Sequence, residues 1–397
     1  MVAGIYHHPP GRLSRWGVVD VGLKCVHSCK HCFYSFLNGE ADQFAGMRHA
    51  KWHSIENLLT LIDSLAEHKF LGFDVTGGEP TAHPGIVDVI ARAAKNGTAS
   101  RIITLGQFLT RRDLLGRLLD AGLTDFRFSL HSTEPEMFRR MTGGDLSLLI
   151  AAMDELQRRG FQYVTNTTIT EQNFEYLPEI ARWIAARPEI YQTTFLFFMP
   201  YYEWSTVHAG DHRVKYTEIA HYLREAVAIV EAAGIGATIR YAPQCMIKGM
   251  ERNHVGIVGV RHDIHEWMNA INHKADPEIT MPDDFRAMGM RFSLHDHETH
   301  YPLSASDPSN RHKGDASEIA TRPGKVFPGK CRGCLAMPVC DGIDRGYLAK
   351  FGDDEISPYA DFRGDILDRE RLAYRAAHVI KTAPYADARG AVQALLR

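Results

Sequence analysis

Apolar and polar residues alternate along the first half of the chain with two different periods. Apolar runs rich in β-branched residues predict six strands. They lie at 17–23, 72–76, 101–105, 125–130, 162–169 and 193–199. Between these runs, apolar residues recur every three or four positions, which predicts helices. The helices lie at 55–68, 85–96, 111–121, 146–159 and 174–186.

This regular order of strand and helix predicts an α/β fold. Parallel strands joined by helical crossovers produce such a pattern, and the crossovers are right-handed. With a further helix at 216–233, residues 17–235 are typical of a partial (β/α)6 barrel of the TIM type. Residues 1–16 precede the first strand as an N-terminal extension. In such a barrel, functional side chains gather where strands end and loops begin.

The periodicity weakens after the barrel, which indicates a second and smaller domain. Residues 236–245 predict a short strand that ends at Cys245. Residues 250–330 are rich in His, Asp, Pro and Gly, which predicts loops. We therefore expect a domain at 236–365 that contains a His-rich loop insertion. Residues 366–397 predict a helical tail.

The overall composition argues against several classes of protein. Of the 397 residues, 45% are hydrophobic, enough for a full-sized core, and the net charge is −3. No basic field therefore indicates binding to nucleic acid or to an anionic membrane. No apolar run reaches the roughly 18 residues of a membrane span, and the N-terminus has no apolar signal-peptide core. We expect a cytoplasmic protein.

The cysteines are the first candidates for chemistry. Seven are present, an odd number that argues against a disulfide framework. Tight clusters of cysteine in a reducing compartment more often bind metal. The clusters are Cys25, Cys29 and Cys32, then Cys331, Cys334 and Cys340, with Cys245 between them.

The first cluster has the spacing C-x3-C-x2-C and directly follows the first predicted strand. Four extended residues span only about 13 Å, so this loop must curl around whatever it holds. A zinc site usually takes pairs of cysteines from separate segments, whereas three on one loop suit a [4Fe-4S] cubane with one open iron. His27 and His31 lie inside the loop, either as further ligands or as loop residues that face the bound group.

Further motifs follow at the ends of later predicted strands. The second strand ends in DVTGGEP (74–80), the fourth in FSLHS (128–132) and the fifth in TNTTIT (165–170). Paired glycines let a backbone approach a ligand closely, and the glutamate can hold an ammonium group. With the aromatic Phe33 directly after the cysteines, this set resembles the radical S-adenosylmethionine (SAM) superfamily over roughly residues 17–200.

The resemblance implies a radical SAM enzyme. Cys25, Cys29 and Cys32 would hold a [4Fe-4S] cluster whose open iron binds SAM. An electron from a flavodoxin or ferredoxin would cleave SAM, and the resulting radical would abstract a hydrogen atom from the substrate. The residues that would contact SAM are Phe33, Thr76, Gly77, Gly78, Glu79, Thr104, Ser129 and Asn166. Leu105 departs from the Thr-Asn-Gly pattern that many members have after the third strand.

The second cluster has the spacing C-x2-C-x5-C, which is similar to part of the auxiliary-cluster domains called SPASM and twitch. A full SPASM domain has enough cysteines for two clusters, but only four lie outside the barrel here, which favours a twitch-like domain with one auxiliary [4Fe-4S] cluster. Cys245 would be its fourth ligand. Alternatively, Cys245 is a hydrogen-atom donor in the pocket, a small buried residue or a zinc ligand with the other three thiols.

These alternatives lead to different reactions. A fully ligated auxiliary cluster can accept an electron from a substrate radical, which gives oxidation or bond formation, whereas a free thiol can return a hydrogen atom, which gives epimerisation. The short segment before the first strand favours a small polar metabolite, such as a sugar or aminocyclitol, over a ribosomally made peptide. A non-catalytic iron–sulfur or zinc protein is the alternative class, but an electron carrier has no need of the Gly-Gly-Glu motif.

Overall fold

The fold comes from a computed structural model of the 397-residue chain. It describes residues 3–7, 16–22, 24–32, 51–67, 69–198, 210–254, 325–336, 340, 342–360 and 379–397. Most of the predicted His-rich insertion lies outside these residues, and so does Phe33.

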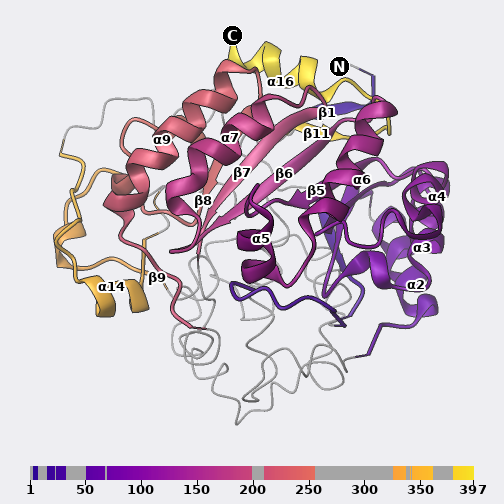
Figure 1. Ribbon diagram of the computed structural model, residues 1–397, viewed down its shortest axis with the longest axis horizontal. Helices are drawn as coiled ribbons and strands as arrows, with labels where there is room; N and C mark the ends of the chain where they lie inside the picture. Colours follow the sequence, from indigo (N-terminus) through magenta and orange to yellow (C-terminus); the bar gives the residue numbers. More distant parts are fainter. Residues whose placement is uncertain are drawn as a thin grey trace.

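A seven-stranded parallel sheet forms the centre of the molecule (Figure 1). Its strands follow one another in chain order, and each is parallel to the next. The strands are β2 (Trp16–Asp20), β3 (Gly72–Thr76), β4 (Ala99–Thr104), β5 (Asp125–Ser129), β6 (Tyr163–Ile169), β7 (Ile190–Phe197) and β8 (Gly236–Arg240). Among the strands that the structure describes, β2 and β8 are the two edges, so the sheet is a partial barrel.

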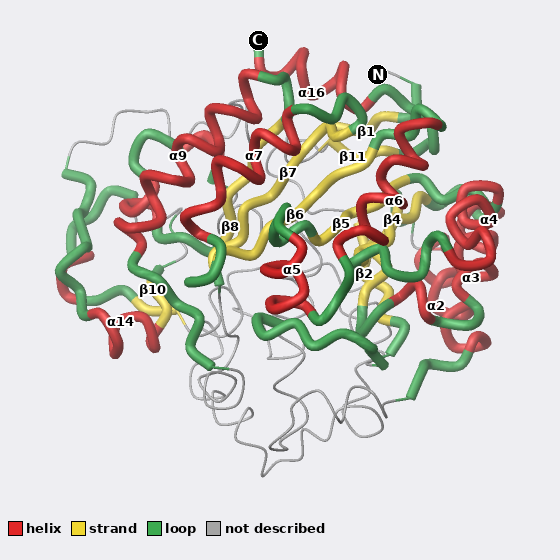
Figure 2. Tube along the Cα trace, in the orientation of Figure 1, coloured by secondary structure: helices red, strands yellow, loops and turns green. Residues whose placement is uncertain are grey.

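Helices connect the successive strands and cover the outside of the sheet, as Figure 2 shows. They are α2 (Ile55–Glu67), α3 (Ile86–Lys95), α4 (Leu114–Asp120), α5 (Pro135–Thr142), α6 (Leu146–Arg158), α7 (Leu177–Ala185) and α9 (Tyr216–Ala232). Short 3-10 helices precede or join them at η2 (Pro80–Ala82), η3 (Arg111–Asp113) and η4 (Phe174–Tyr176). Each main helix buries an apolar stripe at helical spacing, such as Ile86, Val89, Ile90 and Ala93 of α3.

The two faces of the sheet differ in chemistry. Phe73, Phe126 and Phe128 are fully buried in the hydrophobic core. Because side chains alternate along a strand, the neighbouring positions face the other side, and these include the polar residues Asp74 and Arg127. The inner face of the partial barrel therefore carries charged side chains beside apolar ones such as Val18, Ile103 and Leu196.

The sheet has one strand more than the six repeats that the sequence indicated. Residues 236–245 were predicted to begin the second domain, but β8 pairs in parallel with β7, with Leu196 opposite Arg240. α9 and β8 therefore form one more crossover unit of the barrel. The strand ends at Arg240, and Cys245 lies in the following 3-10 helix η5 (Gln244–Ile247). A second 3-10 helix, η6 (Glu251–Asn253), completes this segment.

A small unit packs against the barrel next to α9. It consists of the antiparallel pair β9 (Lys325–Val326) and β10 (Ile343–Asp344), the 3-10 helix η8 (Gly329–Cys331) and α14 (Arg345–Phe351). Tyr347 of α14 stacks on Tyr216 of α9 with ring centroids 4.1 Å apart. The buried Arg213 binds Asp344 at 2.7 Å and so fixes the unit to the start of α9.

The two ends of the chain meet at the end of the barrel where the amino ends of the strands lie. β1 (Ile5–His7) pairs antiparallel with β11 (Val379–Lys381), and α16 (Ala388–Leu396) packs against β7. Figure 1 shows both termini at the same end of the molecule. The N-terminal extension and the tail therefore close the amino ends of the strands. The tail was predicted to be helical, but its described part begins with the strand β11, and only α16 is a helix. None of the helices in the described part of the chain is long and apolar enough to cross a membrane.

Candidate active site

A cavity of about 270 Å³ opens within the partial barrel. Its wall contains the first cysteine cluster and the ends of several strands. The predicted site residues in this wall are Cys25, Cys29, Cys32, Thr76, Gly77, Gly78, Glu79, Thr104, Ser129 and Asn166. The structure thus brings together all the residues predicted to bind SAM or its cluster, apart from Phe33, which lies outside the described residues.

The cysteine loop is held between β3 and α5. Gly78 N donates to the carbonyl oxygen of Gly22 at 2.9 Å, and Glu79 N donates to that of Lys24 at 3.1 Å. On the other side, Ser28 N donates to the carbonyl oxygen of Thr142 at 2.9 Å. The loop is therefore fixed to two separate elements and curls as its close cysteine spacing requires.

The three thiols lie in a buried and negatively biased environment. Burial raises the pKa of Cys25 and of Cys29, and the nearby charges of Glu79 and Cys32 raise both further. The N–H of His27 donates to Cys25 Sγ at 3.4 Å, which favours the thiolate. Thiolates in such a place need a positive partner, and a bound metal centre deprotonates its thiol ligands. Three thiols on one loop therefore fit an iron–sulfur cluster.

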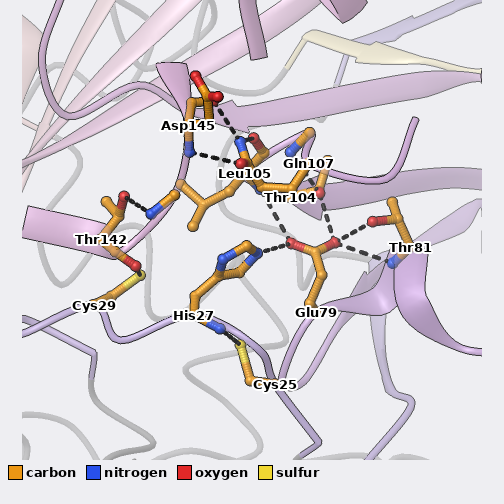
Figure 3. Close-up of polar contacts among 12 residues, drawn as sticks. Cys25, His27, Cys29, Glu79, Thr81, Thr104, Leu105, Gln107, Thr142 and Asp145 are labelled. Atoms are coloured by element: carbon orange, nitrogen blue, oxygen red, sulfur yellow. Dashed lines mark hydrogen bonds and ion pairs between the residues drawn. The ribbon is translucent and has the colours of Figure 1, made fainter. Parts of the chain in front are cut away.

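Glu79 is a rigid, buried carboxylate in the wall of this cavity (Figure 3). It accepts hydrogen bonds from Thr104 Oγ1 at 2.6 Å, from Thr81 N at 3.1 Å and from Leu105 N at 3.3 Å. His27 Nε2 lies 3.2 Å from its second oxygen. Burial raises the pKa of Glu79, but these hydrogen bonds outweigh burial and lower it overall. An ionised carboxylate in a fixed position suits an ammonium ligand.

Thr104 and the Ser129–Asn166 pair have protein partners in the structure. Thr104 donates to Glu79, so its hydroxyl positions the carboxylate. Ser129 and Asn166 face each other on β5 and β6, and Ser129 Oγ donates to Asn166 Oδ1 at 3.3 Å. Their contact with SAM stays a prediction.

A histidine pair in the cavity was not predicted. His31 Nε2 and His131 Nε2 are 3.1 Å apart, which links the cysteine loop to the end of β5. His131 Nδ1 accepts a hydrogen bond from Thr168 N at 3.1 Å, so its proton lies on Nε2, toward His31. Burial lowers the pKa of His131 to about 3, so the ring is neutral. The sequence showed both histidines within motifs but gave no sign that they meet.

Three arginines also line the cavity: Arg101, Arg127 and Arg240. Arg101 binds Asp74 through two hydrogen bonds of 2.7 and 2.9 Å. Arg240 ends β8, and Arg127 lies within β5. An arginine at an inward position of an otherwise apolar strand was the signal that could have identified them from sequence.

The four remaining cysteines converge on a second hollow of about 10 Å³. Its walls include the thiols of Cys245, Cys331, Cys334 and Cys340. Cys245 therefore joins the other three despite its distance in sequence, which is the placement that the fourth-ligand hypothesis requires. Burial, with the charge of Cys245 next in importance, raises the pKa of Cys331 to about 11.

Backbone N–H groups point at the sulfur atoms of this second hollow. Gln244 N and Gly342 N donate to Cys340 Sγ at 3.3 and 3.4 Å, and Tyr359 N donates to Cys334 Sγ at 3.4 Å. Such hydrogen bonds stabilise thiolate ligands and tune iron–sulfur clusters. The donor set therefore fits a second cluster.

Both sets of thiols surround a space. In the parts of the chain that the structure describes, no three His, Cys, Asp or Glu side chains are arranged to hold a single metal ion. A cubane is larger than one ion and takes thiolates from around it. The second hollow is about 10 Å³, and both the auxiliary cluster and the zinc site that the sequence left open stay predictions.

Comparisons with known proteins agree with the cysteine loop and the barrel. Residues 19–184 match the family model of the Radical SAM superfamily. The GTP 3′,8-cyclase of Pseudomonas putida is 29% identical over 223 residues, which cover 55% of this chain and 63% of that protein. The probable GTP 3′,8-cyclase of Sulfolobus acidocaldarius is 27% identical over 165 residues, or 40% of this chain and 50% of that protein. The chain thus spans about half the length of these curated relatives.

One solved structure covers most of the chain. The crystal structure of Streptococcus suis SuiB bound to precursor peptide SuiA aligns with a TM-score of 0.52 and 13% identity, over 90% of this chain and 76% of that one. At this identity the likeness shows the fold alone, and it agrees with the partial barrel. The match to the Radical SAM superfamily covers residues 19–184, the segment that contains the first cysteine cluster and Glu79.

Proposed function

We propose that this protein is a radical SAM enzyme with one auxiliary [4Fe-4S] cluster and that Cys245 is the fourth ligand of that cluster. The observation that carries the proposal is the division of the seven cysteines into two thiol-lined cavities, one with three thiols and one with four. Three thiols leave one iron open for SAM, whereas four complete a closed cluster. When bound, the first cluster and SAM supply one-electron chemistry that removes a hydrogen atom from the substrate.

The residues of the chain position the reactants. Cys25, Cys29 and Cys32 would hold the first cluster, and the fixed carboxylate of Glu79 would bind the amino group of SAM. Leu196 and Phe197 close part of the same cavity with apolar surface, which limits access of water to the reacting atoms. The protein's contribution is therefore orientation and shielding, while the cofactors carry the chemistry.

The position of Cys245 favours oxidation or bond formation over epimerisation. The Cys245 thiol lines the second hollow. Cys245 is absent from the described wall of the barrel cavity that contains the first cysteine cluster. A sulfur atom that ligates iron has no hydrogen atom to return to a substrate radical. A closed cluster near the substrate can instead accept an electron from that radical.

For the substrate we propose a small polar molecule, of which a sugar or aminocyclitol is one class. GTP is the second candidate, because relatives of the matched segment are named GTP 3′,8-cyclases. SuiB is described with a precursor peptide, so a peptide substrate belongs in the same screen. A flavodoxin or ferredoxin would supply the electron.

The test of the cluster assignment is iron and sulfide analysis with Mössbauer spectra of anaerobically reconstituted protein. We expect about eight irons in the wild type, because each cubane holds four. Cys245→Ala should lose or perturb the second cluster and keep the first. Cys25→Ala is the matched control, with the opposite loss. Unchanged spectra in Cys245→Ala would exclude it as a ligand, and about four irons plus zinc in the wild type would refute the auxiliary cluster.

The test of the enzyme is formation of 5′-deoxyadenosine from SAM under reducing, oxygen-free conditions. The wild type should form it, and GTP, sugars, aminocyclitols and peptides should be compared for substrate-dependent stimulation. A protein with both clusters loaded that forms none would instead be a non-catalytic iron–sulfur protein.

A further inference from the structure

The two carboxylate oxygens of Glu79 have different hydrogen-bond partners among the described residues (Figure 3). Oε1 accepts from Thr104 Oγ1 at 2.6 Å, from Thr81 N at 3.1 Å and from the Thr81 hydroxyl. Oε2 has two longer contacts, with His27 Nε2 at 3.2 Å and with Leu105 N at 3.3 Å. Each carboxylate oxygen has two lone pairs, so the three donors at Oε1 leave no place for another. A ligand of Glu79 must therefore bind at Oε2.

The two donors at Oε2 differ in their freedom to move. Leu105 N is a backbone group directly after β4, so its displacement would disturb the end of that strand. The imidazole of His27 is a side chain, which can change rotamer while the backbone stays in place. The backbone next to it is fixed, because Ser28 N donates to the carbonyl oxygen of Thr142 at 2.9 Å. His27 is therefore the donor that can leave Oε2.

His27 also lies on the side of Glu79 that faces the cysteine loop. It stands between Cys25 and Cys29 in the chain, and its backbone N–H donates to Cys25 Sγ at 3.4 Å. The imidazole and the Glu79 carboxylate both line the barrel cavity, and they are 6% and 2% exposed. A ligand that is held at the cysteine loop therefore meets the imidazole where it would reach the carboxylate.

The imidazole does for Glu79 what an ammonium group would do. An ionised carboxylate can only accept hydrogen bonds, so His27 Nε2 is the donor in this contact. Burial raises the pKa of Glu79, but hydrogen bonds lower it overall, and the one from His27 contributes most to the lowering. A buried charge without such donors would be costly. His27 thus stabilises the same charge that a bound amine would stabilise.

We infer that His27 occupies the position of the SAM amine on Glu79 and leaves Oε2 when SAM binds. The inference rests on the proposed function and deepens it, because it adds a positioning residue to the proposed SAM site. Oε2 cannot keep both His27 and an amine beside Leu105 N. Part of the binding free energy of SAM is therefore used to break the contact between His27 and Glu79. The affinity for SAM is lower than Glu79 alone would give.

The experiment measures SAM affinity by equilibrium dialysis on the full-length, anaerobically reconstituted protein. We expect His27→Ala to bind SAM about fivefold tighter or more than the wild type, because no protein hydrogen bond to Oε2 has to be broken. His221→Ala, at an exposed position of α9, is the matched control and should bind SAM as the wild type does. 5′-Methylthioadenosine, which lacks the amine, is the control ligand, and His27→Ala should leave its affinity unchanged.

A double-mutant cycle tests whether the gain depends on Glu79. In a Glu79→Gln background the imidazole no longer faces a carboxylate, so the addition of His27→Ala should give no gain in SAM affinity. An equal gain in both backgrounds, or an equal gain for 5′-methylthioadenosine, would show that the shorter side chain only enlarges the cavity. Either result would overturn the inference.

The sign of the change in SAM affinity also separates this role from a purely structural one. Weaker SAM binding by His27→Ala would show that the imidazole holds Glu79 in place for SAM, and unchanged binding would show that it does not compete with the amine. Both results would overturn the inference. Iron analysis accompanies each measurement. If His27→Ala fails to load iron, His27→Leu, which removes the donor but keeps apolar volume beside the loop, decides the question by the same criteria.

The outcome is separable from that of the proposed function. A wild type that binds SAM, without a gain in His27→Ala, refutes the displacement of His27 and leaves the enzyme intact. A gain in His27→Ala without formation of 5′-deoxyadenosine by the wild type refutes the enzyme and leaves the displacement intact. A wild type that has its first cluster loaded but binds no SAM refutes both.

Discussion

At the scale of single residues, Glu79 shows how the fold prepares a charge for a ligand. Its carboxylate is 2% exposed and accepts hydrogen bonds from backbone and hydroxyl groups of two neighbouring segments. Those donors keep it ionised in a place where burial alone would favour the neutral acid. The energetic cost of the buried charge is thus met by hydrogen bonds before any ligand arrives.

We predict that Glu79→Gln abolishes most SAM binding. The amide removes the negative charge and turns an NH2 group toward donors such as Thr81 N and Leu105 N, so at least one hydrogen bond is lost. We expect a loss of SAM affinity of about tenfold or more by equilibrium dialysis, with unchanged iron content. Glu175→Gln, an exposed glutamate of η4, should behave as wild type. SAM binding by Glu79→Gln at wild-type affinity would exclude Glu79 as the amine site.

The histidine pair leads to a second prediction at this scale. His131 connects the cysteine loop, through His31, to the backbone of β6. His131→Ala should loosen the loop and change the electron paramagnetic resonance spectrum of the reduced first cluster while the second cluster keeps its signal. His221→Ala, exposed on α9, is the control. Identical first-cluster spectra in His131→Ala and the wild type would show that the pair has no part in positioning the loop.

Candidate site residues differed in how well the sequence revealed them. The cysteines and Glu79 lie in short motifs whose spacing already carries the chemistry, and the structure gathers them as predicted. The contact between His31 and His131 depends on which strands become neighbours. The position of Arg127 and Arg240 in the cavity wall depends on which side chains point inward. Such contacts arise from topology, so a local pattern does not contain them.

At the scale of elements, the small unit of β9, β10, η8 and α14 is attached to the barrel by a small set of close contacts. Arg213 is 7% exposed and binds both Asp211 and Asp344, at 3.2 and 2.7 Å. Gly346 lies in the first turn of α14, where a Cβ would collide with the Arg213 guanidinium. The absence of a side chain at Gly346 therefore allows α14 to dock.

We predict that Gly346→Ala weakens this docking and the second cluster with it. Overpacking of this kind costs about 1–3 kcal/mol, and displacement of Arg213 would leave Asp344 without its ion pair. The variant should lose up to about four irons while the first cluster stays, as measured by iron analysis and Mössbauer spectra. Gly329→Ala, in the same unit but with open space around its Cβ position, is the matched control. Full iron loading in Gly346→Ala would show that the unit holds its cluster without this contact.

Most elements of the barrel could be predicted from the chain, because each strand and helix has a clear period of its own. β3, for example, has the bounds that its sequence predicted, Gly72–Thr76. β8 was assigned to the wrong neighbour because a short apolar strand does not show which sheet it joins. The β1–β11 pair could not be predicted either, since its strands are three residues each and come from opposite ends of the chain.

At the scale of the whole molecule, the ends of the chain close the barrel at the amino ends of its strands, opposite the candidate active site. Lys381 of β11 is 1% exposed, and its ammonium donates to the carbonyl oxygen of Gln162 at 2.6 Å and lies 3.5 Å from the centroid of the Phe161 ring. Burial lowers the pKa of Lys381 to about 7, and the nearby charge of Asp125 only partly offsets this. The folded protein therefore holds a lysine that gives up its proton far more easily than an exposed one.

We predict that this lysine makes the stability of the protein depend on pH. Between pH 7 and the ordinary lysine pKa of 10.5, the unfolded chain binds a proton at Lys381 that the folded chain does not, so the free energy of unfolding rises with pH. The slope from one such group is at most about 1.4 kcal/mol per pH unit. In Lys381→Met this contribution is absent, so wild type should gain stability over the variant as pH rises from 7 to 10 in denaturant titrations. Lys95→Met, at an exposed position of α3, should keep the wild-type slope. Parallel pH profiles for wild type and Lys381→Met would show that Lys381 is charged in the folded protein and that the closure below the barrel accommodates an ion.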